Sequence, residues 1–214
     1  SYMPLMIKQV SYDTTCHEHL EYYALKQIDR VTQKAGLRIV DVFFNDVNGG
    51  SFQVVVTKKD SNIPSNIENI NKILKEEEED GFNSMEVFEE FARNTVSSKE
   101  DIISFLHQAK LDGKKVFWYG ASTKGNVTLQ YCGISTDLIP YIVDVNEYKY
   151  GRRTPGTNIQ IISEEEGENM KPDYYFVLPR HFRKGILEKD KIILERWGKF
   201  VFPLPKLEKV RKNE

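Results

Sequence analysis

The sequence predicts an α/β protein with a Rossmann-like, mainly parallel sheet in its carboxy-terminal half. Short apolar runs alternate with helical segments from Lys114 onward, and glycines stand at several junctions. Such runs are typical of strands that helices cover on both faces. We expect strands at Val116–Tyr119, Tyr141–Asp144, Ile159–Ile162, Tyr174–Leu178 and Lys199–Phe202. The loop Gly120–Asn126 should follow the first strand and lead into a helix from Val127 to Gly133.

The first 58 residues read as the truncated end of another α/β domain. Apolar residues recur at three- and four-residue spacings from Leu20, and Gly36 ends the predicted helix. Two strand-like runs, Leu37–Phe44 and Ser51–Thr57, flank the turn Asn45–Gly50 and predict an antiparallel pair. Because one helix and two strands are too few for an independent core, we expect the rest of that domain to be missing.

The middle of the chain predicts a linker followed by helices. Residues 59–65 are polar, and a short helix then runs into the acidic stretch Glu76–Asp80, which we interpret as a solvated helical face. A longer helix is expected over about Ser84–Leu111, with a capping box at Ser98–Asp101 that would break or restart it. The predicted parts are therefore residues 1–58, 59–112, 113–207 and a charged tail at 208–214.

Composition excludes several classes of function. The 214 residues carry a net charge of -2, which gives no argument for binding nucleic acid or a membrane surface. Hydrophobic residues make up 40%, as in a globular protein, and no apolar run has membrane-spanning length. The two cysteines are far apart, so reduced thiols in a cytoplasmic protein are the simplest interpretation.

The segment Cys16-His17-Glu18-His19 is a candidate acid–base site. Imidazole suits proton transfer near neutral pH, and a neighbouring carboxylate raises its basicity. A metal site is an alternative, because His17 and His19 can share one face of an extended segment. The spacing is not H-E-x-x-H and no further ligand cluster accompanies it, so we expect no metal.

The glycine-containing loop Gly120–Asn126 favours an anion site. It lacks the middle glycine of G-x-G-x-x-G, since Ser122 stands there, and Asn126 replaces the lysine of a phosphate loop. A turn that leads into a helix still presents backbone N–H groups and a positive dipole end. Lys124 adds a charge inside the loop, although the glycines can also serve a tight turn alone.

Two further basic loops follow later strands, Tyr150–Thr157 and Pro179–Lys184. Guanidinium groups pair bidentately with phosphate, and we expect both loops on the same rim as Lys124. Asp144 stands where Rossmann domains place a ribose-binding carboxylate, or it caps the loop. A nucleotide or nucleotide-diphosphate sugar is the expected ligand, with a dinucleotide-dependent oxidoreductase as a rival.

Five ordered motifs resemble the S-adenosylmethionine-dependent C-methyltransferases that act on nucleotide-linked keto sugars. They are His17–Tyr23, Asn48–Ser51, Tyr119–Asn126, Gly151–Thr157 and Leu178–Arg183. The resemblance implies that His19 is the base that forms an enolate and that Glu18 orients it. Family members commonly have tyrosine where this chain has Cys16, which leaves enolate stabilisation open. The implied substrate-binding residues are Asn48, Lys124, Asn126, Arg152, Thr157, His181 and Arg183.

The resemblance also implies parts that these residues do not match. Family members carry an amino-terminal zinc-binding module and a glycine-rich S-adenosylmethionine site before the matched region. We therefore expect the cofactor site to lie largely outside this chain and the isolated chain to be inactive. A nucleotide-binding module without methyltransferase activity remains the alternative.

Overall fold

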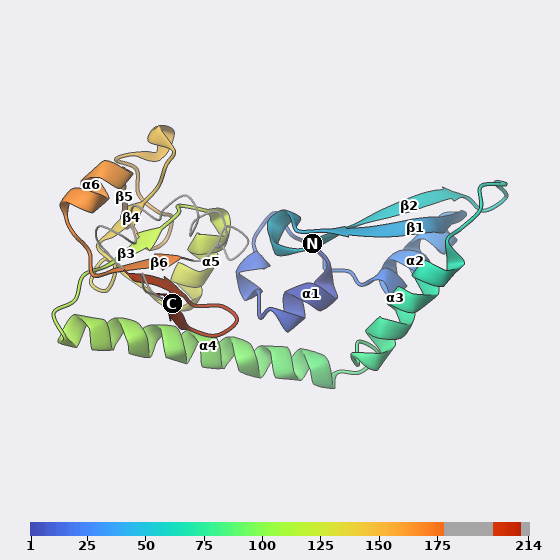
Figure 1. Cartoon of the computed structure of the whole chain (residues 1–214), viewed down its shortest axis with the longest axis horizontal. Helices are drawn as coiled ribbons and strands as arrows, with labels where there is room; N and C mark the ends of the chain where they lie inside the picture. Colours follow the sequence, from blue (N-terminus) through green and yellow to red (C-terminus); the bar gives the residue numbers. More distant parts are fainter. Residues whose placement is uncertain (178–198, 211–214) are drawn as a thin grey trace. The chain divides into compact units, whose positions relative to one another are not determined.

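The computed structural model describes residues 1–177 and 199–210, with the backbone alone at residue 48. The chain divides into two compact units, coloured along the sequence in Figure 1. The first comprises Ser1–Val10 and His19–Arg93, and the second comprises Ser11–Glu18 and Asn94–Glu214. The short segment Ser11–Glu18 therefore belongs to the second unit, although it lies between two parts of the first in sequence.

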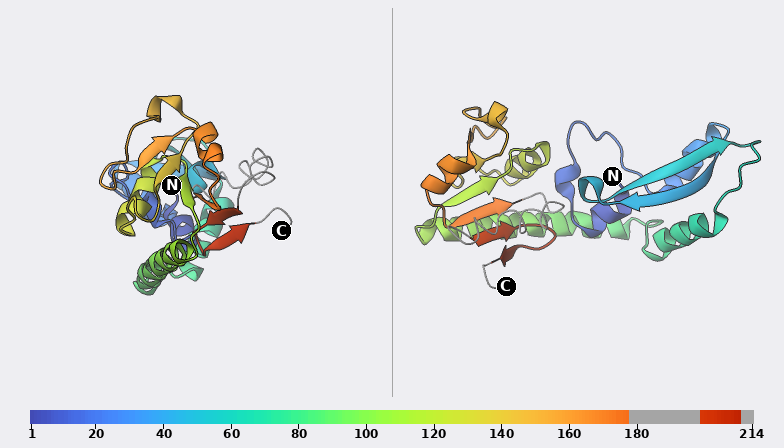
Figure 2. Two further views of the ribbon diagram at one scale, coloured as in Figure 1. Left: turned by 90° about the vertical axis from the view of Figure 1, so that its left-hand side faces the viewer. Right: turned by 45° about the horizontal axis from the view of Figure 1, so that its top comes forward.

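The first unit contains a two-stranded antiparallel sheet. Strands β1 (Leu37–Asn45) and β2 (Ser51–Lys58) form the long ribbon seen in the right panel of Figure 2. Helix α2 (Leu25–Lys34) leads into β1 through Gly36, whose φ of 73° is the left-handed conformation that glycine tolerates. The predicted strand pair and the helix stop are confirmed. The helix begins five residues later than the predicted start at Leu20.

Helix α3 (Ile67–Glu79) packs with this sheet rather than lying in a linker. Its apolar side joins α2 and β1 in one small core, composed of Leu25, Ile39, Val42, Ile70 and Ile73. A further short helix, α1 (Met3–Lys8), occupies the segment before the histidine cluster. The second apolar cluster of this unit contains Met3, Ile7, Ala24 and Phe82. The first unit thus has a larger apolar core than the one helix and two strands predicted from the sequence would provide.

The acidic run in α3 is not wholly a solvated face, as the sequence had suggested. Glu77 is 3% exposed and its carboxylate accepts hydrogen bonds from the backbone N–H groups of Leu25 (2.6 Å) and Lys26 (3.1 Å). Tyr2 Oη donates a third bond at 2.7 Å. The first N–H groups of a helix lack partners within the helix, so Glu77 satisfies the start of α2.

Helix α4 (Glu86–Leu111) is continuous, so the break expected at Ser98 is wrong. Ser98 is buried in the helix interior, and Ile102, Leu106 and Ala109 continue the same buried side. Burial of that apolar stripe stabilises the helix through the position where a cap was predicted. Residues 94–111 of α4 belong to the second unit.

The second unit contains a six-stranded sheet in the order β5-β4-β3-β6-β7-β8. All neighbouring pairs are parallel except β7 and β8, which are antiparallel. The strands are β3 (Val116–Tyr119), β4 (Tyr141–Val143), β5 (Gln160–Ile162), β6 (Tyr174–Val177), β7 (Lys199–Phe202) and β8 (Glu208–Val210). This is the strand order of a Rossmann fold, with the switch point between β3 and β6. The predicted fold class is confirmed, and β8 extends the sheet beyond residue 207.

Helices cover both faces of this sheet. Trp118 and Phe176 stack at 5.2 Å on the face that Phe105 of α4 also contacts, and α5 (Thr123–Tyr131) lies beside Trp118 through Gly125. On the other face, α6 (Glu164–Asn169) packs through Gly167 against Val143. Figure 1 labels α4, α5 and α6 around the central strands. None of the described helices is long and apolar enough to cross a membrane.

Candidate functional site

The turn after β3 carries the residues expected to bind an anion. Gly120 has a φ of 95°, and the Ser122 hydroxyl caps α5 by accepting a hydrogen bond from Gly125 N–H at 3.0 Å. The helix begins at Thr123, four residues earlier than predicted, so Lys124 and Asn126 lie in its first turn. Both side chains are partly buried. The amino terminus of α5 adds its positive dipole end to the Lys124 charge.

Asp144 holds this turn in place from the end of β4. Its Oδ2 atom accepts hydrogen bonds from Ala121 N–H at 2.7 Å and from Lys149 Nζ at 3.0 Å, and Oδ1 accepts from Asn146 N–H at 2.8 Å. Lys149 also donates to Ala121 O at 2.8 Å. Asp144 is 6% exposed. Of the two roles considered for this carboxylate, the structure favours the one that caps the loop, since both its oxygens already have protein partners.

The basic loop after β4 runs away from this turn. Backbone bonds join Gly151 and Arg152 to Ile161, so residues 151–153 run antiparallel along β5. The tip of the loop then meets the other end of α5, where Gln130 Nε2 donates to Pro155 O at 3.1 Å. The expectation that the whole loop shares the rim of Lys124 is therefore wrong. The chain folds back along the sheet edge to complete the hydrogen bonds of β5.

The loop residues predicted to bind substrate have different surroundings. Arg152 is exposed, and its guanidinium has no hydrogen-bond or ionic partner among the residues that the structure describes. The Thr157 hydroxyl lies 2.7 Å from that of Thr154, which also accepts a hydrogen bond from Ile159 N–H. His181, Arg183 and the side chain of Asn48 lie outside the described residues.

The candidate catalytic residues are accessible. Cys16 is a free, half-buried thiol, and His17 and Glu18 are exposed, with Nε2 and Oε1 3.8 Å apart. In the first unit, His19 is half-buried and its ring lies 6.5 Å from the ring of Tyr22, centre to centre. The imidazole closest to the Glu18 carboxylate in the structure is therefore that of His17. Orientation of His19 by Glu18 stays a prediction.

The residues before this cluster bind it to the second unit. The short 3-10 helix η1 (Tyr12–Thr14) packs on α5, and the ring of Tyr12 lies 5.3 Å from that of Tyr131. Asp13 is buried at 6% exposure. Burial raises the pKa of Asp13 to about 6, although the charge of Lys124 acts to lower it. Asp13 is therefore a buried acid whose pKa reflects both its burial and the charge of Lys124.

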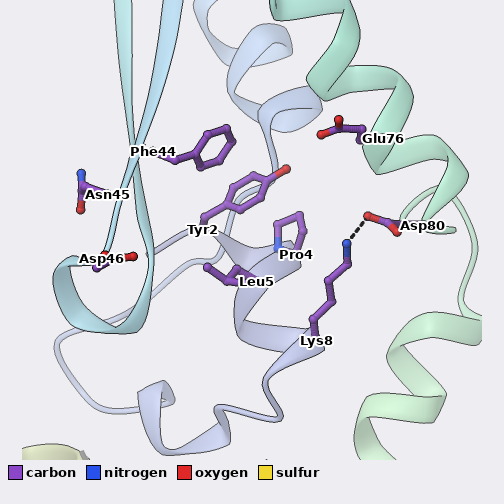
Figure 3. Close-up of a pocket in the computed structure, with 9 residues that line it drawn as sticks. All are labelled: Tyr2, Pro4, Leu5, Lys8, Phe44, Asn45, Asp46, Glu76 and Asp80. Atoms are coloured by element: carbon purple, nitrogen blue, oxygen red, sulfur yellow. Dashed lines mark hydrogen bonds and ion pairs between the residues drawn. The ribbon is translucent and has the colours of Figure 1, made fainter. Parts of the chain in front are cut away.

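A pocket of about 360 Å³ in the first unit has the wrong charge for a phosphate. Figure 3 shows apolar and acidic side chains around it, with Lys8 paired to Asp80. The lining residues are Tyr2, Pro4, Leu5, Lys8, Phe44, Asn45, Asp46, Glu76 and Asp80. Three carboxylates against one already paired lysine disfavour an anion. In the described part of the chain, no three His, Cys, Asp or Glu residues are placed to hold a metal ion.

Comparison with known proteins decides the family. A family model described as the C-methyltransferase C-terminal domain matches residues 46–205. C-methyltransferase NovU of Streptomyces niveus is 32% identical over 206 residues, which is 95% of this chain. This chain belongs to the C-methyltransferase family. It spans 48% of the length of NovU, about half of that relative.

Within this C-methyltransferase chain, sequence reasoning missed two groups near the α5 turn. Lys149 had no predicted role, although its ammonium lies against the Gly120–Ser122 turn, and its position five residues after Asp144 was the available signal. Tyr12 and Asp13 had no predicted role either. Nothing in their spacing indicates that they pack on a helix more than 100 residues later in the chain.

Proposed function

We propose that this chain is the substrate-binding and base-carrying portion of an S-adenosylmethionine-dependent C-methyltransferase that acts on a nucleotide-linked keto sugar. Family membership is the observation that carries the proposal. The Rossmann strand order adds to it, because ligands in such sheets bind at the carboxyl ends of the strands near the switch point. The turn with Lys124 lies at the carboxyl end of β3, next to that point.

The diphosphate of the sugar nucleotide would bind at the first turn of α5. Lys124 contributes charge, Asn126 contributes an amide donor, and the helix dipole adds a favourable field. Lys149 keeps the turn closed through its bond to Ala121 O. Among the described residues, the exposed guanidinium of Arg152, further along the loop, has no hydrogen-bond or ionic partner. By family resemblance, the proposed set also includes Asn48, Thr157, His181 and Arg183.

His19 is the proposed base. It would take a proton from the carbon next to the sugar ketone, and the electron pair of that C–H bond would move into the carbonyl to give an enolate. Glu18 and Cys16 flank the base in sequence and are proposed to tune its basicity and the enolate environment. A half-buried imidazole such as His19 is accessible to substrate while it is partly shielded from water.

S-adenosylmethionine would supply the methyl group, but the described residues do not fit it. The first unit pairs two antiparallel strands, and its described residues include no parallel strand that leads through a glycine-rich turn into a helix. In the second unit, the acid at the ribose-binding position, Asp144, already accepts hydrogen bonds from Ala121 N–H, Asn146 N–H and Lys149 Nζ. We therefore propose that the cofactor binds outside these 214 residues and that the isolated chain is inactive.

A dinucleotide-dependent oxidoreductase is the weaker alternative. Its ribose-binding acid would be Asp144, yet both oxygens of that carboxylate accept hydrogen bonds from the loop and from Lys149. Ser122, where the fingerprint has glycine, uses its hydroxyl to cap α5. These contacts leave neither group placed for a dinucleotide.

Calorimetric titration of the chain with nucleoside diphosphates tests the binding proposal. Lys124→Gln should weaken the tightest of UDP, GDP, CDP and dTDP about 5- to 30-fold, the usual effect of removing a charged hydrogen-bond donor. Lys110→Gln is the matched control, because Lys110 is an exposed lysine of the same unit that pairs with Asp137. Equal affinities of the two variants would contradict the assignment of the α5 turn.

A further inference from the structure

The short 3-10 helix η3 (Glu147–Lys149) is tied to the turn that follows β3. On one side, Asp144 Oδ1 accepts a hydrogen bond from Asn146 N–H at 2.8 Å, and Asn146 Oδ1 accepts one from Tyr148 N–H at 3.1 Å. On the other side, the Lys149 ammonium donates to a backbone carbonyl of the α5 turn at 2.8 Å. The backbone at Tyr148 is therefore fixed one residue away from a lysine that contacts the proposed phosphate site.

Tyr148 exposes its ring on this fixed backbone. Its exposed fraction is 78%, whereas tyrosine is usually intermediate in burial. Tyr131 of the same unit is 37% exposed, and its ring lies 5.3 Å from that of Tyr12 and 5.0 Å from Lys99 Nζ. Among the described residues, no such ring or cation covers Tyr148. An aromatic ring on a rigid backbone loses little entropy when a flat ligand stacks on it.

The ring follows the strand end where the nucleoside half of a ligand lies on such a sheet. In Rossmann sheets, the phosphates bind at the helix after the first strand, and the ribose lies at the end of the next, here β3 and β4. Tyr148 is the fifth residue after Val143, which ends β4. The carboxylate of Asp144, at the ribose position, is engaged by the loop itself. The loop therefore offers the nucleoside an exposed aromatic ring rather than a free carboxylate.

We propose that Tyr148 is a nucleobase-binding residue: its exposed ring stacks on the base of the nucleoside diphosphate whose phosphates bind at the α5 turn. Every base has a π face, so one phenol ring can stack on any of them while its hydroxyl stays in water. The inference rests on the proposed function, since it requires the phosphates to bind near Lys124. It adds the part of the chain that holds the base, which the phosphate contacts leave unassigned.

Calorimetric titration of Tyr148 variants of the whole chain tests the stacking. The probe is whichever of UDP, GDP, CDP and dTDP binds the unmodified chain most tightly. Tyr148→Ala should weaken the probe about 5- to 150-fold, the range that alanine substitution gives for base–aromatic stacking. Tyr148→Phe keeps the ring and should bind the probe as the unmodified chain does. Leu111→Ala is the control, since Leu111 is an 81% exposed apolar side chain of the same unit, and it should not change the affinity.

Tryptophan fluorescence supplies a second measurement, which a purely structural role of Tyr148 would not change. Tyr148→Trp should bind the probe at least as tightly as the unmodified chain, because indole also stacks on bases. A base in contact with the new indole should quench its emission, measured as the difference from the unmodified chain. Leu111→Trp places an indole at another exposed position of the unit, and its emission should not respond to the probe.

Equal probe affinities of Tyr148→Ala and the unmodified chain would overturn the inference and leave the proposed function standing. An equal loss of affinity in Tyr148→Phe, or unquenched emission in Tyr148→Trp, would overturn it too. A change of oligomeric state in Tyr148→Ala, measured by sedimentation velocity, would assign the ring to a contact with a second copy of the chain instead of a base. Absence of binding by all four nucleoside diphosphates would reject both the inference and the proposed function.

Discussion

At the residue scale, two buried carboxylates differ in whether hydrogen bonds satisfy their oxygens. Glu77 accepts three hydrogen bonds and completes the start of α2. Asp13 is similarly buried, but its Oδ1 atom has no hydrogen-bond partner in the part of the chain that the structure describes. A satisfied buried carboxylate stabilises the fold, whereas an unsatisfied one costs stability. This contrast gives two predictions.

Glu77→Gln should destabilise the chain by about 2–3 kcal/mol, because the amide cannot accept from three donors as the carboxylate does. Urea unfolding at neutral pH measures the loss. Glu79→Gln is the control on the same helix, since Glu79 is exposed in an i,i+4 pair with Lys75, and it should change stability by less than about 0.5 kcal/mol. Equal effects of the two substitutions would refute the capping role of Glu77.

Because of Asp13, the free energy of unfolding should fall as pH rises from about 4 to about 6. Its folded pKa of about 6 lies above the ordinary value of 3.8, so the folded state holds the proton more tightly. The penalty is then fully present above about pH 6 and is at most about 3 kcal/mol. Asp13→Asn should unfold at higher urea than the unmodified chain at pH 8, with the difference shrinking toward pH 4. A constant difference across this range would contradict the shift.

At the scale of elements, helix α6 packs closely on strand β4, which leads into Asp144. A Cβ atom on Gly167 of α6 would lie 2.6 Å from Val143 Cγ2 in β4, and Val143 directly precedes Asp144. The glycine therefore lets α6 approach the strand that carries the acid of the α5 turn. A close helix–strand approach of this kind tolerates no added side chain without movement.

Gly167→Ala should cost about 1–2 kcal/mol in the free energy of unfolding, even though alanine favours helix by about 1 kcal/mol. Urea unfolding compares it with Glu165→Ala, an exposed position of the same helix. The control should stay within about 0.5 kcal/mol of the unmodified chain. Stabilisation by Gly167→Ala would show that α6 does not pack on Val143 as described.

Element prediction from sequence succeeded where the pattern is local. The apolar runs located β3, β4, β5, β6 and β7 to within a residue or two, because strands buried on both faces are continuous apolar segments. It failed where a distant contact decides the outcome. The start of α5 at Thr123 depends on the Ser122 cap, and the continuity of α4 through Ser98 depends on burial against the rest of its unit.

At the scale of the whole molecule, the candidate site was predicted only in part. The Lys124 turn was found because glycines and a lysine between strand and helix are a local signal. The return of the Arg152 loop along β5 and the packing of Asp13 on α5 join residues far apart in the chain, and no spacing reveals them. The Rossmann strand order and the family match together support a substrate-binding role.

The central claim is that this chain binds the sugar nucleotide and not the methyl donor. Isothermal titration of the chain with a nucleoside diphosphate and, separately, with S-adenosylmethionine tests it directly. We predict saturable binding of the diphosphate, weakened by Lys124→Gln, and no heat of binding from S-adenosylmethionine. Micromolar binding of S-adenosylmethionine together with no binding of any nucleoside diphosphate would contradict the account.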